Sequence, residues 1–248
     1  MENTSYNGIS EEYKNSHDLP YRHALEEYTM AALCGPVSNL SVLDLACGAG
    51  YYTRKFKTQG ASVVTGVDIS SEMIAMAAAE EKNSPLGVTY LERDVAELET
   101  MGVFDIVTGI YLLNYARSAD ELLSFFQAAL RNLKPGGRFI GLVDNPWFPL
   151  HHPYENYRKY GMTKECPPDV KDGEHHKISF YNADGSRFDL HIPYLSPQTY
   201  QRVIEEAAFS SFKWFSPMLD PKVKENDKEQ FWSDLVNKPA SMAFVGEK

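Results

Sequence analysis

A glycine-rich turn and a distant acidic residue are spaced for binding a nucleotide-like ligand. The apolar stretch Val42–Leu45 runs straight into Gly48-Ala49-Gly50. Glycines at such a turn allow the backbone to approach a ligand closely and to take positive φ angles. Asp68 ends the next apolar run, about 20 residues after the turn, where a carboxylate accepts hydrogen bonds from both hydroxyls of a ribose. This pairing predicts a ribose-containing ligand.

A second acidic residue, Asp94, follows the third apolar run in Glu92-Arg93-Asp94-Val95. If that run is a strand, Asp94 lies at the same carboxyl edge of the sheet as Asp68, which is where open α/β sheets bind ligands. Its carboxylate can accept a hydrogen bond from an exocyclic adenine amine. The spacing supports equally well a simple helix N-cap before Ala96.

The elements that must position these residues alternate between short apolar runs and helical patterns, which is typical of βαβ units and a parallel sheet. Ser70 or Ser71 is expected to cap the helix after the second strand, and Ser118 with Glu121 forms a capping box before another helix. Lys134 to Gly137 is expected to break the chain before the fifth strand. The predicted strands span residues 40–46, 63–68, 88–92, 104–110 and 137–143.

The flanking segments predict a cap and a lid. An amphipathic helix is expected between Pro20 and Gly35-Pro36, and residues 145–177 form an irregular insertion. Alternating apolar residues around Asp184-Gly185 predict a β-hairpin, followed by a helix at 197–207 and closing strands at 211–219 and 240–246. We expect one domain with a helical cap (1–36), a cofactor-binding core (37–144), a substrate-covering insertion (145–195) and a closing segment (196–248).

The chain resembles the class I S-adenosylmethionine-dependent methyltransferases. The resemblance rests on Val42 to Gly50, Val67-Asp68-Ile69-Ser70, Arg93-Asp94-Val95, Phe104-Asp105-Ile106-Val107 and Leu133-Lys134-Pro135-Gly136-Gly137, in family order and spacing. It implies a Rossmann-like α/β fold with a seven-stranded, mostly parallel sheet, and S-adenosylmethionine as cofactor with S-adenosylhomocysteine as product. The cofactor-binding residues that it implies are Tyr13, Arg22, Ala46, Gly48, Gly50, Asp68, Ile69, Met73, Asp94, Val95, Ile110 and Tyr111.

Two other motifs, for dinucleotide binding and for nucleic-acid methylation, are matched only in part. Thr53 stands where the dinucleotide fingerprint GxGxxG has its third glycine, so a dehydrogenase is the weaker interpretation. Asp144-Asn145-Pro146-Trp147 is similar to the Asn-Pro-Pro-Tyr box of nucleic-acid amino-methyltransferases. That box follows the fourth strand, whereas this segment follows the predicted fifth, so we interpret the similarity as coincidence.

The methyl acceptor is expected beyond the fourth strand and under the insertion, which is richer in aromatic residues than the chain-wide 12%. Methyl transfer requires in-line placement of the acceptor, and no single catalytic residue is predicted. The pairs His151-His152 and His175-His176 lack the ligand spacing of a metal site, so no metal is expected. The predicted substrate contacts are Tyr111, Asn114, Tyr115, Trp147 and Tyr181.

A narrower resemblance, to the toxoflavin-type N-methyltransferases, rests on Tyr111 to Ala116 and Phe231-Trp232. It implies a planar nitrogen heterocycle as acceptor, with O- and C-methylation left open. A non-catalytic cofactor-binding protein and a protein-directed methyltransferase are the alternatives.

The formal net charge of −10 disfavours nucleic acid as a partner and an anionic membrane as a surface. The three cysteines form no disulfide or zinc pattern, and the polar amino-terminal residues form no secretory signal. We therefore expect a cytoplasmic protein that acts on a small molecule, with its oligomeric state open.

Overall fold

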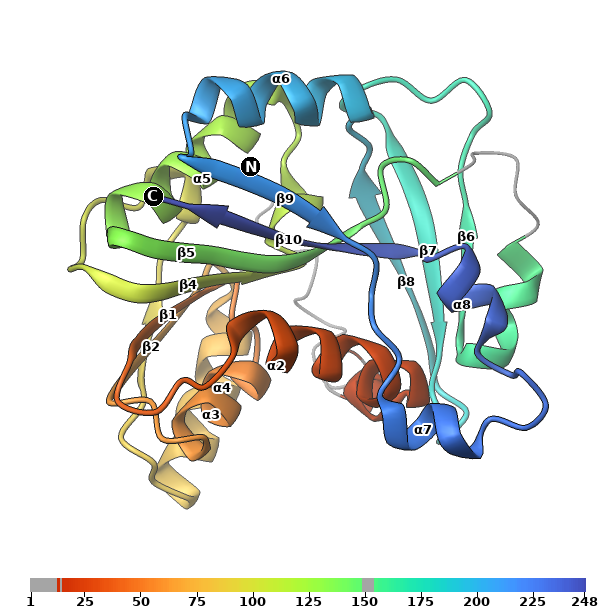
Figure 1. Cartoon of the computed structure of the whole chain (residues 1–248), viewed down its shortest axis with the longest axis horizontal. Coiled ribbons are helices and arrows are strands. Elements are labelled where there is room, and N and C mark those ends of the chain that lie inside the picture. The colour runs from red at the N-terminus through yellow and green to blue at the C-terminus, as the bar shows by residue number, and fades with distance from the viewer. Residues whose placement is uncertain (1–12, 14, 149–153) are drawn as a thin grey trace.

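The computed structural model describes residues 13, 15–148 and 154–248. Its centre is a seven-stranded sheet with the order β3-β2-β1-β4-β5-β10-β9 (Figure 1). Strands β1 to β5 are parallel, and β10 runs antiparallel to both β5 and β9. This is the predicted Rossmann-like sheet. The strands are β1 (Ser41–Leu45), β2 (Val63–Asp68), β3 (Thr89–Glu92), β4 (Phe104–Ile110), β5 (Leu133–Asp144), β9 (Ser211–Phe215) and β10 (Ser241–Glu247).

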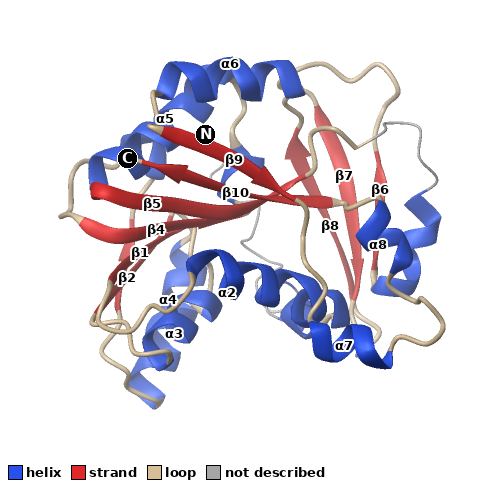
Figure 2. Ribbon diagram, viewed as in Figure 1, coloured by secondary structure: helices blue, strands red, loops and turns tan. Residues whose placement is uncertain are grey.

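Helices cover both faces of this sheet (Figure 2). On one face lie α2 (Tyr28–Cys34), α3 (Tyr51–Thr58) and α4 (Ser71–Asn83); on the other lie α5 (Ala119–Asn132) and α6 (Pro197–Ala207). Each face buries its own apolar cluster, because the strands of a parallel sheet are covered on both sides. Ser70 and Ser118 cap α4 and α5 as predicted, accepting hydrogen bonds from the backbone N–H groups of Met73 and Glu121.

The N-terminal helix has an unusual turn. After the short 3₁₀ segment η1 (Ser16–Asp18), residues Arg22–Glu27 (η2) form a π-helix that leads directly into α2. The wider π turn is frequent at functional sites. Here it buries two charged residues, Arg22 and Glu26, which an amphipathic pattern does not predict.

The segment after β5 forms a second sheet of three antiparallel strands, β6 (Met162–Glu165), β7 (His175–Tyr181) and β8 (Arg187–Pro193). The predicted hairpin is β7 and β8, whose Ile178, Phe180 and Phe188 are buried in a cluster with the N-terminal helix. Short helical segments complete the chain: η3 (Val95–Glu97), η4 (Leu112–Tyr115), η5 (Tyr154–Tyr160), α7 (Pro221–Asn226) and α8 (Ser233–Asn237).

Four predictions of secondary structure need correction: the start of the fifth strand, the chain break before it, the irregular insertion, and the closing strand β9, which ends at Phe215 rather than at residue 219. Strand β5 begins at Leu133 rather than at residue 137, and the Pro-Gly segment appears instead as a shift of register between Phe104 and Ile106 of β4. Strand β6, η5 and the helices α7 and α8 lie in segments that the sequence pattern left irregular or unassigned. Among the described residues, no helix combines the length and apolar character that crossing a membrane requires.

Candidate functional site

The glycine turn after β1 has the backbone conformation that its sequence predicts. Ala46, Gly48 and Gly50 all have positive φ angles, of 57°, 55° and 87°. A Cβ added to Gly50 would lie 2.4 Å from the hydroxyl oxygen of Tyr90, so neither the conformation nor the space admits a side chain there. The turn therefore brings bare backbone to the carboxyl edge of the sheet.

Asp68, at the end of β2, fixes this turn. Its Oδ2 accepts a hydrogen bond from the backbone N–H of Gly48 at 2.8 Å, and its Oδ1 accepts one from the N–H of Ser70 at 2.8 Å. The side chain is buried, which raises the pKa of its carboxyl, although the backbone hydrogen bonds oppose the shift. Each carboxylate oxygen has two acceptor positions, so the pair retains capacity for ligand hydroxyls.

A cavity of about 1070 Å³ opens beside Asp68, and we call it the Asp68 cavity. Of the predicted cofactor residues, all except Gly50 and Arg22 line it. Gly50 instead lies against the ring of Tyr90, and Arg22 lines a neighbouring cavity. Six further lining residues were not among the predicted cofactor contacts: Ser70, Leu112, Tyr115, Arg117, Glu121 and Phe125.

Asp94 combines the two interpretations that its spacing left open. Its Oδ1 accepts a hydrogen bond from the backbone N–H of Ala96 at 2.8 Å, which is an N-cap of η3. The residue also lines the Asp68 cavity beside Val95. The capping hydrogen bond holds the Asp94 side chain at the cavity wall, so Asp94 can cap η3 and contact a ligand at the same time.

A second cavity, of about 710 Å³, adjoins the first, and we call it the Phe180 cavity. Tyr13, Tyr111 and Tyr115 line both cavities, so the two share a wall of aromatic rings. The remaining lining residues come from the N-terminal helix, the ends of β4 and β5, the three-stranded sheet and the segment before β10. They are Tyr21, Arg22, Leu25, Glu26, Asn114, Asp144, Met162, Ile178, Phe180, Leu190, Ile192, Pro217, Leu235, Pro239, Ala240 and Ser241.

A buried ionic cluster stands at the shared wall. Arg22 donates from Nη1 to Glu26 Oε2 at 3.3 Å, and the hydroxyl of Tyr111 donates to Glu26 Oε1. Both charged side chains are almost fully buried, and within the described residues the buried Arg22 Nε has no hydrogen-bond partner. Burial raises the pKa of Glu26, although Arg22 opposes the shift. The guanidinium also lies 5.9 Å from the ring centres of both Tyr13 and Tyr111.

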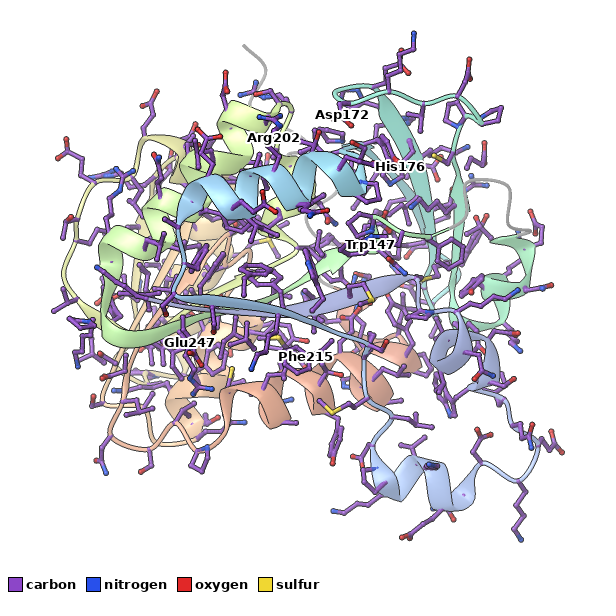
Figure 3. All side chains as sticks on the ribbon, turned by 45° about the horizontal axis from the view of Figure 1, so that its top comes forward. Trp147, Asp172, His176, Arg202, Phe215 and Glu247 are labelled. Atoms are coloured by element: carbon purple, nitrogen blue, oxygen red, sulfur yellow. The ribbon has the colours of Figure 1, made fainter. Side chains whose placement is uncertain are left out.

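Two predicted substrate contacts lie outside both cavities. Trp147 is 47% exposed and packs edge-on against Trp214 of β9, 5.0 Å between ring centres (Figure 3). Tyr181 packs between the guanidinium groups of Arg158 and Arg187, at 4.2 and 5.2 Å from its ring centre. Both aromatics have protein partners elsewhere, so we remove them from the candidate site.

The other predicted substrate contacts, Tyr111, Asn114 and Tyr115, do line the Phe180 cavity. Of the predicted histidine pairs, His151-His152 lies outside the described residues. His176 is buried on β7 (Figure 3). No group of three or more potential metal ligands occurs in the described part of the chain.

Comparison with known proteins identifies the family. Residues 42–137, which contain the glycine turn, Asp68 and Asp94, match the family model described as a methyltransferase domain. A solved S-adenosylmethionine-dependent methyltransferase from Clostridium acetobutylicum has the same fold, with a TM-score of 0.63 and 20% identity over 98% of each chain. Residues 42–137 therefore form a methyltransferase domain, and the chain has the fold of solved S-adenosylmethionine-dependent methyltransferases.

Two curated relatives extend this comparison. The methyltransferase is 24% identical over 206 residues to a putative methyltransferase of Geobacillus sp. (strain WCH70), covering 77% of this chain and 82% of the relative. It is 30% identical over 165 residues to the demethylmenaquinone methyltransferase of Lactococcus lactis, covering 63% of this chain and 64% of the relative. The family model stops at residue 137, so most of the Phe180 cavity lies outside it.

Proposed function

We propose that this methyltransferase binds S-adenosylmethionine in the Asp68 cavity and transfers its methyl group to a small molecule in the Phe180 cavity. The observation that carries the proposal is the pair of adjoining cavities, one lined by the cofactor motif and the other enclosed mainly by apolar and aromatic side chains. The Lactococcus lactis relative is named for demethylmenaquinone, a small molecule, which supports the same acceptor class.

The residues around the Asp68 cavity fit the cofactor chemically. Asp68 offers carboxylate oxygens to the ribose hydroxyls, Ile69 and Met73 offer apolar surfaces to the adenine, and Asp94 offers an acceptor to its amine. Arg22 lines the adjoining cavity, and its buried Nε–H forms no hydrogen bond within the described residues, so it can donate to a carboxylate of the ligand. When bound, S-adenosylmethionine supplies a methyl group on a positively charged sulfur.

The contribution of the protein to the reaction is placement. Methyl transfer is an in-line displacement, so holding the acceptor atom against the methyl group lowers the barrier by several kcal/mol through proximity alone. Tyr111 is rigid because its hydroxyl is bonded to Glu26 and its backbone N–H donates to the carbonyl of Leu142. The apolar walls around Phe180 exclude water from the acceptor.

We further propose that the acceptor is a compact, planar nitrogen heterocycle. The tyrosines at the shared wall can stack on a flat ring, and Asn114 and Asp144 add polar atoms to a cavity that is lined mainly by apolar and aromatic side chains. The toxoflavin-type resemblance of Tyr111 to Ala116 supports the same acceptor class. The three residues of that segment that line the cavity are Tyr111, Asn114 and Tyr115.

Calorimetry with S-adenosylhomocysteine tests the cofactor assignment. We expect the wild type to bind it and Asp68→Ala to lose about a hundredfold in affinity, since two charge-assisted hydrogen bonds to the ribose contribute about 3 kcal/mol. Asp189→Ala is the matched control, because Asp189 is a partly exposed carboxylate on β8 that pairs with Arg187. Equal affinities in wild type and Asp68→Ala would refute the assignment.

The acceptor class is tested with methyl-labelled S-adenosylmethionine and a metabolite extract separated from its proteins. We expect mass spectrometry to find the label in a small molecule. Label that appears only in an added protein fraction would instead indicate a protein-directed enzyme. An absence of label in both fractions, with cofactor binding intact, would indicate a non-catalytic cofactor-binding protein.

A further inference from the structure

The Phe180 cavity contains one acidic side chain from the central sheet, Asp144, at the carboxyl end of β5. Two basic residues of the three-stranded sheet stand behind it. Lys164 Nζ of β6 lies 2.5 Å from Asp144 Oδ2, and His176 Nε2 of β7 lies 3.3 Å from the same oxygen. The backbone N–H of Asp144 donates to Asn114 Oδ1 at 2.9 Å, which links the carboxylate to the end of β4.

The two oxygens of this carboxylate have different surroundings. Both basic partners contact Oδ2, and no hydrogen bond within the described residues reaches Oδ1. Oδ1 is not completely buried, and the Asp144 side chain as a whole is 17% exposed. Because Asp144 lines the Phe180 cavity, Oδ1 is an acceptor presented to whatever binds there.

The carboxylate is held in its charged form. Burial alone would raise the pKa of Asp144, but the attraction of Lys164 and the contact with His176 hold it below its usual value. Burial lowers the pKa of His176, although the neighbouring Asp144 opposes the shift. The other charged residues of the cavity wall, Arg22 and Glu26, bond to each other, so Asp144 is the anionic group whose acceptor oxygen is open to a ligand.

We propose that Asp144 Oδ1 accepts a hydrogen bond from an N–H group of the methyl acceptor, with Lys164 and His176 as positioning residues that fix the carboxylate. This inference rests on the proposed function and adds a specificity determinant to it. The acceptor class is a heterocycle with an N–H on one side and a nitrogen lone pair on the other, as in an imidazole-type ring.

The chemistry of such a ring balances without a strong base. The nitrogen lone pair forms the new C–N bond, and the C–S bond breaks with its electron pair passing to sulfur. The positive charge moves from sulfur to the ring, where the anionic Asp144 stabilises it through the N–H. The N–H proton stays on the ring until the product leaves and then passes to water. A hydroxyl acceptor would need to lose its proton during attack, for which a carboxylate of lowered pKa is poorly suited.

A pair of isosteric probes tests this assignment. Benzimidazole has the N–H, and benzoxazole has an oxygen in its place. Binding of each is measured by calorimetry on protein saturated with S-adenosylhomocysteine. We expect wild type to bind benzimidazole about tenfold more tightly, the ratio that a hydrogen bond to a charged group produces. Asp144→Leu has a similar shape and no acceptor, so it should abolish this preference, and the matched control Asp189→Leu, on β8, should retain it.

A second variant covers a folding defect, since Asp144→Leu removes the negative charge that faces the buried Lys164. Asp144→Leu combined with Lys164→Met removes both charges and the side-chain acceptor, and it should bind the two probes equally. A preference for benzimidazole that survives in either variant overturns the assignment. So does a wild type that binds the two probes equally, or that fails to bind benzimidazole at millimolar concentration. Loss of S-adenosylhomocysteine binding in wild type is a separate failure, of the proposed function.

Discussion

Asp44 of β1 is a buried carboxylate, and its hydrogen bonds within the described part of the chain come from two hydroxyl groups. Its Oδ2 accepts from Thr53 at 2.7 Å, and its Oδ1 accepts from Thr108 at 2.7 Å. No cation within the described residues forms an ion pair with it. Burial, the dominant cause, raises the pKa of Asp44 to about 6. Replacing Asp44 with asparagine keeps the shape and removes the charge.

The magnitude follows from linkage between ionisation and folding. An unfolded aspartate has a pKa near 3.9, so the folded value is raised by about two units, or ~3 kcal/mol at 1.36 kcal/mol per unit. Below pH 4 both states are protonated and the shift has no effect. Between about pH 4 and pH 6 only the unfolded state ionises, so the stability of the wild type falls as pH rises. Above pH 6 the penalty is constant.

Urea denaturation of wild type and Asp44→Asn at several values between pH 4.5 and pH 7.5 measures this term. We expect the free energy of unfolding of the variant, relative to wild type, to rise by about 2 kcal/mol across that range, because part of the penalty is already present at pH 4.5. The change with pH is the quantity of interest, since it cancels any constant difference in hydrogen bonding.

Asp105→Asn is the matched control with the opposite sign. Asp105 accepts from Lys134 at 2.8 Å, which holds the pKa of its carboxyl down at about 2. The stabilising contribution of its charge is lost only as pH falls from about 4 to about 2, so the difference between Asp105→Asn and wild type should stay constant from pH 4.5 to pH 7.5. A difference between Asp44→Asn and wild type that does not change with pH would refute the reasoning.

Two further predictions concern backbone and charge. Gly50→Ala should lower the free energy of unfolding by at least ~1 kcal/mol more than Gly136→Ala in urea titrations. Both glycines have positive φ, but only at Gly50 would the added Cβ lie against Tyr90. Equal effects of the two substitutions would show that contact with Tyr90 does not matter. Arg22→Met should cost about 3 to 5 kcal/mol by leaving Glu26 buried and unpaired, and adding Glu26→Gln should recover most of this loss. If the double variant is no more stable than the single one in thermal unfolding, the charge argument is wrong.

The central sheet and the Asp68 cavity could be predicted because their signals are local. The apolar runs that end at Leu45 and Asp68 give the strand ends, and parallel strands bring those ends to one edge. The N-terminal helix shows the limit of this reasoning. Its periodicity predicted a buried apolar face, but not that the π turn would also bury Arg22 and Glu26.

The Phe180 cavity could not be predicted in the same way, because its polar contacts join segments far apart in sequence. Lys164 meets Asp144 only when β6 packs beside the end of β5, and β6 is too short and too polar to show a strand pattern. The aromatic enrichment of residues 145–195 predicted an enclosed site in this segment, and Phe180 of this segment does line the cavity. It did not distinguish Phe180 from Trp147, which packs against the edge strand β9.

The wall of the Phe180 cavity is built from segments that are far apart in the sequence. Its lining residues come from Tyr13 near one end of the chain and from Ser241 near the other, whereas the Asp68 cavity draws on residues 46–125 and Tyr13 alone. An occupant of the Phe180 cavity therefore acts as a noncovalent crosslink between η2 and β10. Amide hydrogen exchange that requires release of the occupant should slow in both segments by the common factor 1 + [L]/Kd, although the two are remote in sequence.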